Sequence, residues 1–238
     1  MYNIFYAMFL TRFYTGKDKR IYTKERYNNL TSKLCANQVQ EEHIEEITEK
    51  YRIDLHIPVI LGIENEQLDK EVHKDIKRDV EKFINELKQS TNEYISPNIP
   101  YYLESSYNIY NHDKQILSFC IRYSNYYGGA HGMSYKICYN YDIKAGKRVA
   151  LSDLFHDQFY VGAINNEIEW QIKKRNKALG YEAINAFKGI SDRQKFYIKN
   201  GELVIYFDLY EIAPYVAGIL EFSIPKKVLI NTSYIYSK

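Results

Sequence analysis

The sequence is poor in the residues that build metal centres and disulfide frameworks. It contains only three cysteines, Cys35, Cys120 and Cys138. No CxxC pair occurs and the spacings match no zinc pattern, so a cysteine-based zinc site is excluded. Because three is an odd number, a framework in which every cysteine is paired is excluded too. We expect no metal and no other cofactor.

The chain also lacks a strong excess of charge. Its 32 Lys and Arg residues against 30 Asp and Glu residues leave a formal net charge of +2. Proteins that bind nucleic acids usually carry a basic excess or a basic stripe, and neither is visible. We therefore expect no nucleic-acid partner.

Long hydrophobic runs are missing as well. The apolar segment Tyr2–Leu10 has about half the length that is needed to span a bilayer. It lacks a positively charged stretch before it and a clear small-residue cleavage site after it. It is open whether this is a degenerate signal segment, a fragment of an anchor or an amphipathic start. Membrane association is expected only through a lost or truncated anchor at this end.

Tyrosine is abundant, with 25 copies among 238 residues. A tyrosine side chain has a large apolar body and a polar tip, so it suits both half-buried sheet faces and recognition surfaces. For any single tyrosine, the place in a sheet is the more common role. The chain is long enough for one large domain or two small ones.

The first half of the chain predicts a strand followed by a long helix. Tyr51–Ile60 alternates between apolar and polar residues, as a strand with one solvated face does, and Pro58 places it at an edge or ends its pairing. Glu64–Gln89 carries apolar residues at steps of three and four, which predicts a helix that Ser90–Pro100 ends. The preceding Val39–Lys50 is either a helix or an acidic lead-in.

Three antiparallel strands are expected next, at Pro100–Asn111, Lys114–Asn125 and Met133–Ile143. If the last two fold back about Gly129, apolar residues face each other on one side of the pair. In this register Phe119 faces Tyr139 and Cys120 faces Cys138. A shift by one residue would destroy the separation of the faces.

The first two of these strands, Pro100–Asn111 and Lys114–Asn125, are expected to form a hairpin in the same way. Ile109 is expected opposite Leu117, and Leu103 opposite Tyr123, around a turn at Asn111–Asp113.

The second half predicts a helix and further strands. A short helical piece at Leu151–Phe155, with Ser152 as its cap, precedes a helix at Asp157–Lys177. Phe196–Phe207 is a hairpin with Asn200–Gly201 as a two-residue type I′ turn. Ile219–Ile224 is the last strand.

These elements predict an α+β fold in which antiparallel sheets are packed by two long helices. We expect an N-terminal segment at 1–50, a first α+β subdomain at 51–132 and a second at 133–238 that shares the sheet.

Two segments carry a resemblance to a known family. They are Tyr126–Gly132 (YYGGAHG), with its following strand and the LSDLF segment, and Tyr206–Gly218 (YFDLYEIAPYVAG). With the IPVI pattern at Ile57–Leu68, they resemble a bacterial family of paired domains of unknown function. The pair forms the extracellular, lysozyme-binding part of the anti-sigma-V factor. It also precedes the catalytic domain of a peptidoglycan deacetylase. The resemblance covers roughly residues 50–228.

The resemblance implies an extracytoplasmic or cell-surface module that binds a protein, lysozyme-like, or a cell-wall glycan. It does not imply deacetylase activity, which belongs to a separate domain, and the chain is more in keeping with a binding protein than with an enzyme. The candidate ligand-binding residues lie in the two family segments, and the sheet register moves the emphasis from the first to the second. They are Tyr126, Tyr127, Gly129, His131, Tyr210, Glu211, Pro214 and Tyr215.

The same residues allow less common interpretations. Glu211 and His131 are weak catalytic candidates, as the acid and base of a cell-wall polysaccharide hydrolase. A Glu in this position more often binds backbone amides, and the glycine-rich loop is more often a tight connection with His131 beneath Tyr210–Tyr215. A metal site from His131, His112, His156, Asp153 and Glu211 has no chelating spacing to support it.

Two questions stay open at the level of sequence. Cys120 and Cys138 form a disulfide in an oxidising compartment or stay as small thiols, and we favour the thiols because cross-strand disulfides are often strained. Exposed tyrosines also permit a third function, a structural module that associates with itself.

Overall fold

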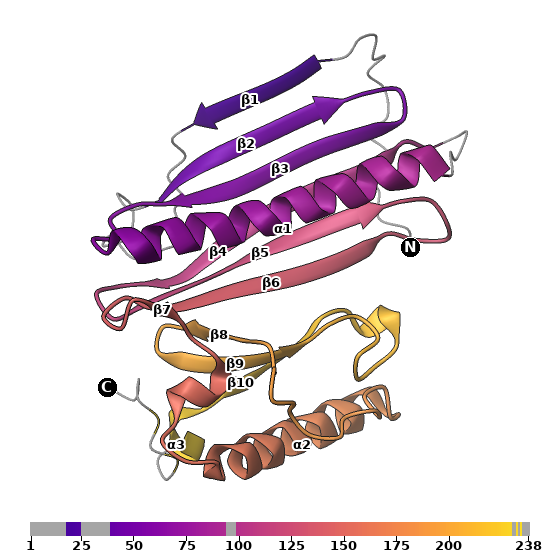
Figure 1. Cartoon of the computed structure of the whole chain (residues 1–238). Helices are drawn as coiled ribbons and strands as arrows, with labels where there is room; N and C mark the ends of the chain where they lie inside the picture. Colours follow the sequence, from indigo (N-terminus) through magenta and orange to yellow (C-terminus); the bar gives the residue numbers. More distant parts are fainter. Residues whose placement is uncertain (1–17, 25–38, 94–98, 230–231, 233, 235–238) are drawn as a thin grey trace.

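The computed structural model describes residues 18–24, 39–93, 99–229, 232 and 234. This part of the chain forms a seven-stranded sheet, a three-stranded sheet and two long helices (Figure 1), which confirms the predicted α+β class. The large sheet consists of β1 (Asp18–Lys24), β2 (Val39–Ile47), β3 (Tyr51–Ile60), β4 (Tyr101–His112), β5 (Ile116–Tyr126), β6 (Met133–Asp142) and β7 (Lys147–Arg148). The other elements are α1 (Glu66–Glu93), α2 (Phe159–Leu179), β8 (Phe196–Lys199), β9 (Glu202–Phe207), β10 (Leu220–Ile224) and α3 (Lys226–Leu229).

The strands of the large sheet follow one another in chain order from β1 to β7. All neighbours are antiparallel except β3 and β4, which run parallel. The expectation of purely antiparallel sheets is wrong at this pair, because α1 returns the chain to the starting end of β3 before β4 begins. The expectation that Pro58 places this strand at an edge is wrong, because β3 lies between β2 and β4 and pairs with β2 through Pro58 as far as Ile60. Pairing with β4 ends at Leu55, so Pro58 withdraws no donor from that ladder.

The segment Val39–Lys50 contains β2, so it is neither a helix nor an irregular lead-in. Its register with β3 places Ile44 opposite Leu55 and His43 opposite His56. The predicted segment Tyr2–Leu10 lies outside the described residues.

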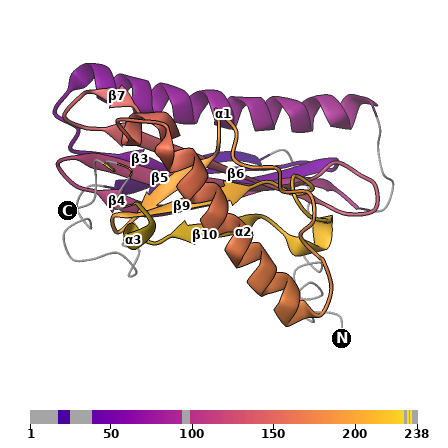
Figure 2. The same ribbon diagram turned by 90° about the horizontal axis from the view of Figure 1, so that it is seen from below.

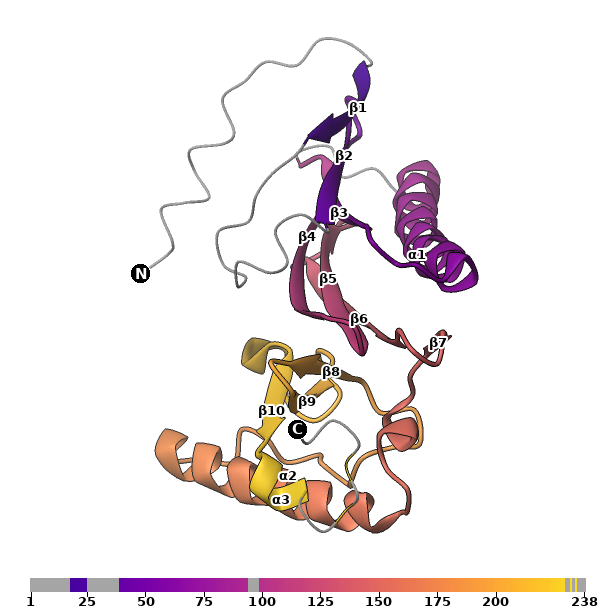
Figure 3. The same cartoon turned by 90° about the vertical axis from the view of Figure 1, so that its left-hand side faces the viewer.

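Helix α1 covers one face of the large sheet (Figure 3). Its apolar stripe, which includes Leu68, Val80 and Leu87, is buried against the inward residues of β3 to β6. The side chain of Asn65 caps the helix by accepting the backbone N–H groups of Gln67 and Leu68. This burial stabilises the helix more than propensity does.

The pairing of β5 with β6 has the predicted register, with Phe119 opposite Tyr139 and Cys120 opposite Cys138. The register predicted for β4 and β5 is wrong by two residues, since Ile109 pairs with Phe119. A shift of two keeps every side chain on its face, so the alternation of apolar residues could not detect it. A bulge at Tyr110 absorbs the extra residue before the turn.

The three-stranded sheet and α2 form a second unit beside the β6 end of the large sheet (Figure 1), and α2 crosses the strands of the small sheet (Figure 2). The Asn200–Gly201 turn has φ values of 51° and 75°, as a type I′ turn requires, which confirms the prediction. The expectation that Ser152 caps the piece after β7 is wrong. Ala150 occupies the cap position of this 3-10 helix (Leu151–Leu154), and the Asp153 carboxylate accepts its N–H at 2.9 Å.

Two large apolar cores lie in the described chain, one under α1 and one between α2 and the small sheet. A third, smaller apolar cluster lies where the two sheets meet and consists of Cys120, Cys138, Tyr197, Val204 and Tyr206. β6 belongs to the first core although it follows residue 132, and β2 adds to the sheet from within 1–50. We therefore propose a division near residue 148, with the first unit running from β1 to β7. No helix in the described part of the chain has both the length and the apolar character needed to cross a bilayer.

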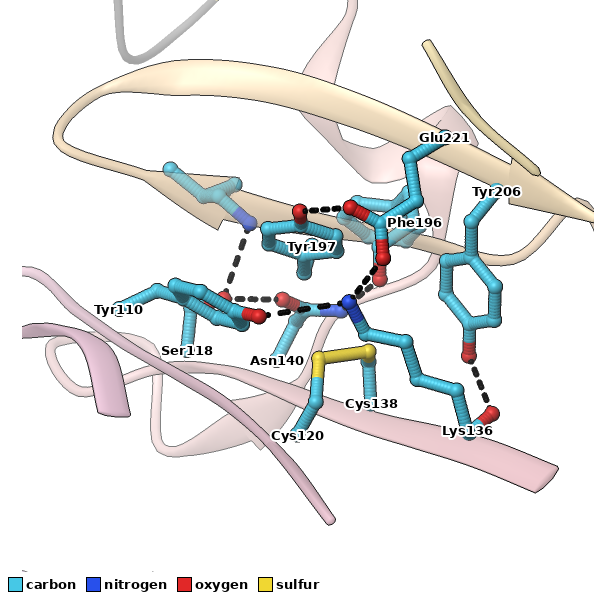
Figure 4. Close-up of a disulfide and its surroundings, with 11 residues drawn as sticks. Tyr110, Ser118, Cys120, Lys136, Cys138, Asn140, Phe196, Tyr197, Tyr206 and Glu221 are labelled. Carbon is cyan, nitrogen blue, oxygen red and sulfur yellow. Dashed lines mark hydrogen bonds and ion pairs between the residues drawn. A yellow bond between two sulfur atoms is a disulfide. The ribbon is translucent and has the colours of Figure 1, made fainter. Parts of the chain in front are cut away.

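A polar junction joins the two units (Figure 4). Buried Ser118 accepts the N–H of Ile198 at 2.9 Å, and the Asn140 amide donates to the carbonyl of Phe196 at 2.9 Å. Beside them, Cys120 and Cys138 form a disulfide across β5 and β6. The expectation of free thiols is wrong, because the directly opposed pair brings the two Cα atoms to 4.0 Å.

Lys136 completes this junction. Its side chain is almost fully buried and its ammonium group lies 4.1 Å from the centre of the Tyr197 ring, with Tyr110 and Tyr206 around it. The carboxylate of Glu221 in β10 accepts a hydrogen bond from this ammonium group at 2.5 Å. Burial opposes ionisation of Glu221, but hydrogen bonds from Lys136 and Tyr197 outweigh it and lower the pKa of the carboxyl.

Candidate functional site

The two segments that carry the family resemblance lie against each other in the folded chain. The loop from Tyr126 to Gly132 joins β5 to β6, and the loop from Asp208 to Gly218 joins β9 to β10. The two loops therefore meet at the junction of the two units, because β6 belongs to the large sheet and β9 to the small one.

The first loop is held in a conformation that needs glycine. Gly128 and Gly129 have φ values of 88° and 97°, a region that other residues rarely adopt. The Tyr126 hydroxyl donates to the carbonyl of Gly129 at 3.0 Å, and the Tyr126 ring stacks on Tyr102. This part of the loop is a braced connection between strands.

The second loop presents its aromatic residues outward. Tyr210 adopts a φ of 66°, which is unusual for a residue with a Cβ, and 56% of it is exposed. Pro214 is exposed as well, and Tyr215 begins a short 3-10 helix (Tyr215–Ala217). Within it, Val216 is 88% exposed. Sequence reasoning missed Val216, since a single valine between two tyrosine motifs gives no periodic signal.

His131 and Tyr215 connect the two loops. Their rings stack with centres 4.1 Å apart, and the Tyr215 hydroxyl donates to the carbonyl of Gly132 at 2.8 Å. The Nδ1 atom of His131 lies 3.0 Å from the same carbonyl oxygen and must donate to it, because a carbonyl cannot donate. In the neutral ring Nε2 is then the acceptor, and the Tyr210 hydroxyl lies 3.3 Å from it.

We call the set His131, Tyr210, Pro214, Tyr215 and Val216 the aromatic patch, in which Tyr215 is half-buried and the other four are exposed. The stack and the three hydrogen bonds hold its aromatic rings in place before any ligand arrives. Such preorganisation lowers the entropy cost of binding, and tyrosine and proline have few torsions left to freeze.

The other predicted ligand-binding residues lie apart from the patch. Tyr127 packs on the first core, and its hydroxyl donates to the carbonyl of Phe83 in α1 at 3.4 Å. Burial raises the pKa of Tyr127 to about 12. Tyr126 and Gly129 are engaged with each other, because the Tyr126 hydroxyl donates to the carbonyl of Gly129.

The two catalytic candidates are engaged in local structure. The Glu211 carboxylate accepts the N–H of Asp208 at 2.8 Å and so closes its own turn. His131 uses both ring nitrogens on Gly132 and Tyr210. Within the described residues, Glu211 and His131 share no hydrogen bond or ion pair. The geometry therefore offers no prepared pair of acid and base.

The five residues considered for a metal do not gather either. His112 is buried in β4, where burial lowers its pKa against the opposing effect of Asp113, and Asp153 holds the turn at Ala150. In the part of the chain that the structure describes, one group has metal-ligand spacing, and it consists of His43, Asp54 and His56. It escaped the sequence analysis because Val39–Lys50 was not recognised as a strand.

Two family models match this chain, one in each of its two units. The family model of the deacetylase PdaC matches residues 44–134, which contain the end of β2 and all of β3 to β5 with α1. The model of a protein family of unknown function, DUF3298, matches residues 152–227, which contain the second unit. The paired-domain organisation expected from the two motifs is thus confirmed.

Two proteins of Bacillus subtilis (strain 168) are similar in sequence. The anti-sigma-V factor RsiV is 29% identical over 196 residues, which cover 79% of this chain and 67% of that protein. The peptidoglycan-N-acetylmuramic acid deacetylase PdaC is 26% identical over 170 residues, which cover 69% of this chain and 36% of that protein.

Two solved structures share the fold. A DUF3298 family protein from Pseudomonas aeruginosa PAO1 has a TM-score of 0.59 at 14% identity, over 93% of this chain and 94% of that one. A DUF3298 family member from Bacteroides fragilis NCTC 9343 has a TM-score of 0.53 at 17% identity, over 91% and 92%. At these identities the likeness extends to the fold alone.

Proposed function

We propose that this chain, which pairs a PdaC-type domain with a DUF3298 domain, is a non-catalytic extracytoplasmic module that binds a protein of the lysozyme type. The aromatic patch carries the proposal. It is exposed, apolar at Pro214 and Val216, and fixed by hydrogen bonds between two units of the chain. Exposed apolar and aromatic clusters of this kind are typical of interaction sites.

The disulfide supports an extracytoplasmic location. Cys120 and Cys138 are joined in the middle of a buried junction, and such bonds persist in oxidising compartments. The resemblance of the chain to the anti-sigma-V factor points in the same direction.

A protein ligand fits the patch better than a cell-wall glycan does. Sugar rings need polar partners for their hydroxyl groups as well as an aromatic platform. At the patch, His131 already uses both nitrogens internally, and the Tyr215 hydroxyl is committed to Gly132. Val216 and Pro214 add apolar surface, which a protein side chain can cover.

The test is calorimetric titration of the chain with hen egg-white lysozyme and, separately, with soluble peptidoglycan fragments. We expect binding to lysozyme that Tyr210→Ala weakens by about tenfold or more, as removal of an interface hot spot does. Tyr181→Ala is the matched control, because Tyr181 is 63% exposed but lies beyond the end of α2, and it should leave the affinity unchanged.

The opposite results would each remove part of the proposal. Equal loss of affinity in both variants would separate binding from the patch, and binding to peptidoglycan fragments alone would replace the protein ligand with a glycan. Light scattering on the same samples distinguishes ligand binding from self-association.

A further inference from the structure

We propose that His43, Asp54 and His56 form a binding site for a zinc-class divalent metal ion on the large sheet. This site is independent of the aromatic patch. It lies on β2 and β3, on the face turned away from α1 (Figure 3), because Leu55 between Asp54 and His56 is buried under that helix.

The strand register brings the three side chains together. Asp54 and His56 are two residues apart in β3, so they project from the same face, and His43 is directly opposite His56 in β2. The Nε2 atom of His43 lies 2.8 Å from Oδ1 of Asp54, and Nε2 of His56 lies 3.5 Å from the same oxygen. One donor atom from each residue lies within 4.8 Å of the other two.

These separations are close to what a metal requires. Zinc bonds of about 2.0–2.2 Å in a tetrahedron put neighbouring donors about 3.3 Å apart. The two imidazole rings now stack with centres 4.4 Å apart and an angle of 8° between them. They must tilt for both Nε2 atoms to point at one ion, and the second torsion of a histidine is soft enough to allow this.

The surroundings resemble the outer shell of a metal centre. The other nitrogen of His56, Nδ1, lies 3.1 Å from the carboxylate of Glu41, and that carboxylate is nearly buried. A histidine held between a carboxylate and a metal is a recurrent arrangement, since the carboxylate fixes the tautomer and makes the free nitrogen more basic. The second oxygen of Asp54 is held at 2.5 Å by Arg52, which leaves the first oxygen for the ion.

The charge balance also suits a cation. Glu45 and Glu104 stand opposite Asp54 on the two neighbouring strands, and Glu41 lies beside His56. With Asp54 they make four carboxylates beside the site, against Arg52 and against Arg20 and Lys24, which pair with Glu45 and Glu41 in β1. Two imidazole nitrogens and one carboxylate oxygen form a donor set that suits zinc and similar ions better than calcium or magnesium, and a water molecule would complete the tetrahedron.

The experiment is titration of the untagged, chelator-treated full chain with a zinc salt near neutral pH, followed by calorimetry. We expect one ion per chain, with binding below detection for His43→Gln and His56→Ala. Glu41→Gln should weaken binding by about 10–100-fold, as loss of an outer-shell carboxylate does. His73→Ala is the control, because His73 lies 3.5 Å from Asp69 on the surface of α1 without a third ligand, and it should bind zinc as the unmodified chain does.

Circular dichroism is used to check whether each variant is folded. Should His56→Ala fail to fold, His43→Gln and Glu41→Gln carry the test. Absence of binding to the unmodified chain at hundred-micromolar zinc would overturn the proposal. So would unchanged affinity in the folded His43→Gln variant, because the ion would then bind elsewhere.

Discussion

At the scale of single residues, Gly132 shows how tightly the first loop of the candidate site packs on the strands of the large sheet. A Cβ atom added at this position would lie 2.7 Å from the backbone oxygen of Asn125 and 3.0 Å from the hydroxyl of Tyr102. The same residue offers its carbonyl to both His131 and Tyr215. A glycine is required here by space rather than by a positive φ.

We expect Gly132→Ala to lower the free energy of unfolding by about 1–3 kcal/mol, because the neighbouring backbone cannot give way without disturbing the strand pairing. Urea unfolding followed by circular dichroism measures the effect. Gly162→Ala is the matched control, since a Cβ there meets nothing within 4 Å and the residue lies inside α2. That variant should be unchanged or more stable by up to about 1 kcal/mol. Equal stability of both variants would contradict the account of Gly132.

The residues of the candidate site differ in how far sequence could place them. The glycines and His131 could be located, because a glycine-rich loop between two alternating strands has few conformations open to it. The orientation of Tyr127 could not, since neighbouring tyrosines in a loop give no alternation, and only the structure shows it packed on α1. The group of His43, Asp54 and His56 could not be predicted for a different reason, because its geometry depends on the pairing of two strands, β2 and β3.

At the scale of elements, the β5–β6 hairpin combines a specified register with a covalent link. Side-chain alternation fixes which faces meet, and the pairing puts Cys120 opposite Cys138. The register of β4 with β5 shows the limit of this reasoning. Two registers that differ by two residues bury the same side chains, and the bulge at Tyr110 decides between them.

We expect reduction of the disulfide to lower the free energy of unfolding by about 2–4 kcal/mol, because the bond closes a sequence separation of 18 residues and restricts the unfolded chain. Urea unfolding with and without reductant gives the difference. The variant in which Cys120 and Cys138 are both replaced by Ala should be insensitive to reductant.

Thiol labelling of the denatured chain checks the covalent state directly. One reactive thiol, that of Cys35, is expected before reduction and all three cysteines after it. Three reactive thiols before reduction would show that the bond is absent.

At the scale of the whole molecule, the two large apolar cores are connected by a polar junction. The junction consists of the Ser118–Asn140 network, the disulfide and Lys136 in its cage of tyrosines (Figure 4). The aromatic patch lies on loops from both sides of this junction. Its geometry therefore depends on the two units staying docked.

The class and the main elements of this architecture follow from periodicity, but the junction does not. The sequence pattern predicts a solvated face of the hairpin for Ser118, Asn140 and Lys136, because these polar residues alternate with apolar ones. They are buried only because the second unit covers them, and that contact joins residues about 56 to 85 positions apart in the chain.

We predict that the junction makes the two units unfold together. In hydrogen exchange under increasing urea, amides of α1 and of β9 should then report the same free energy of opening. Asn140→Ala removes the donor to the Phe196 carbonyl and the acceptor of the Ser118 hydroxyl proton, both in buried positions, at a cost of about 1–3 kcal/mol. In this variant β9 should open at lower free energy than α1. Leu87→Ala, which opens a cavity in the first core on the opposite face of the large sheet from the junction, should lower both values together. Different free energies in the unmodified chain would show that the units are independent, and the aromatic patch would then need another source of rigidity.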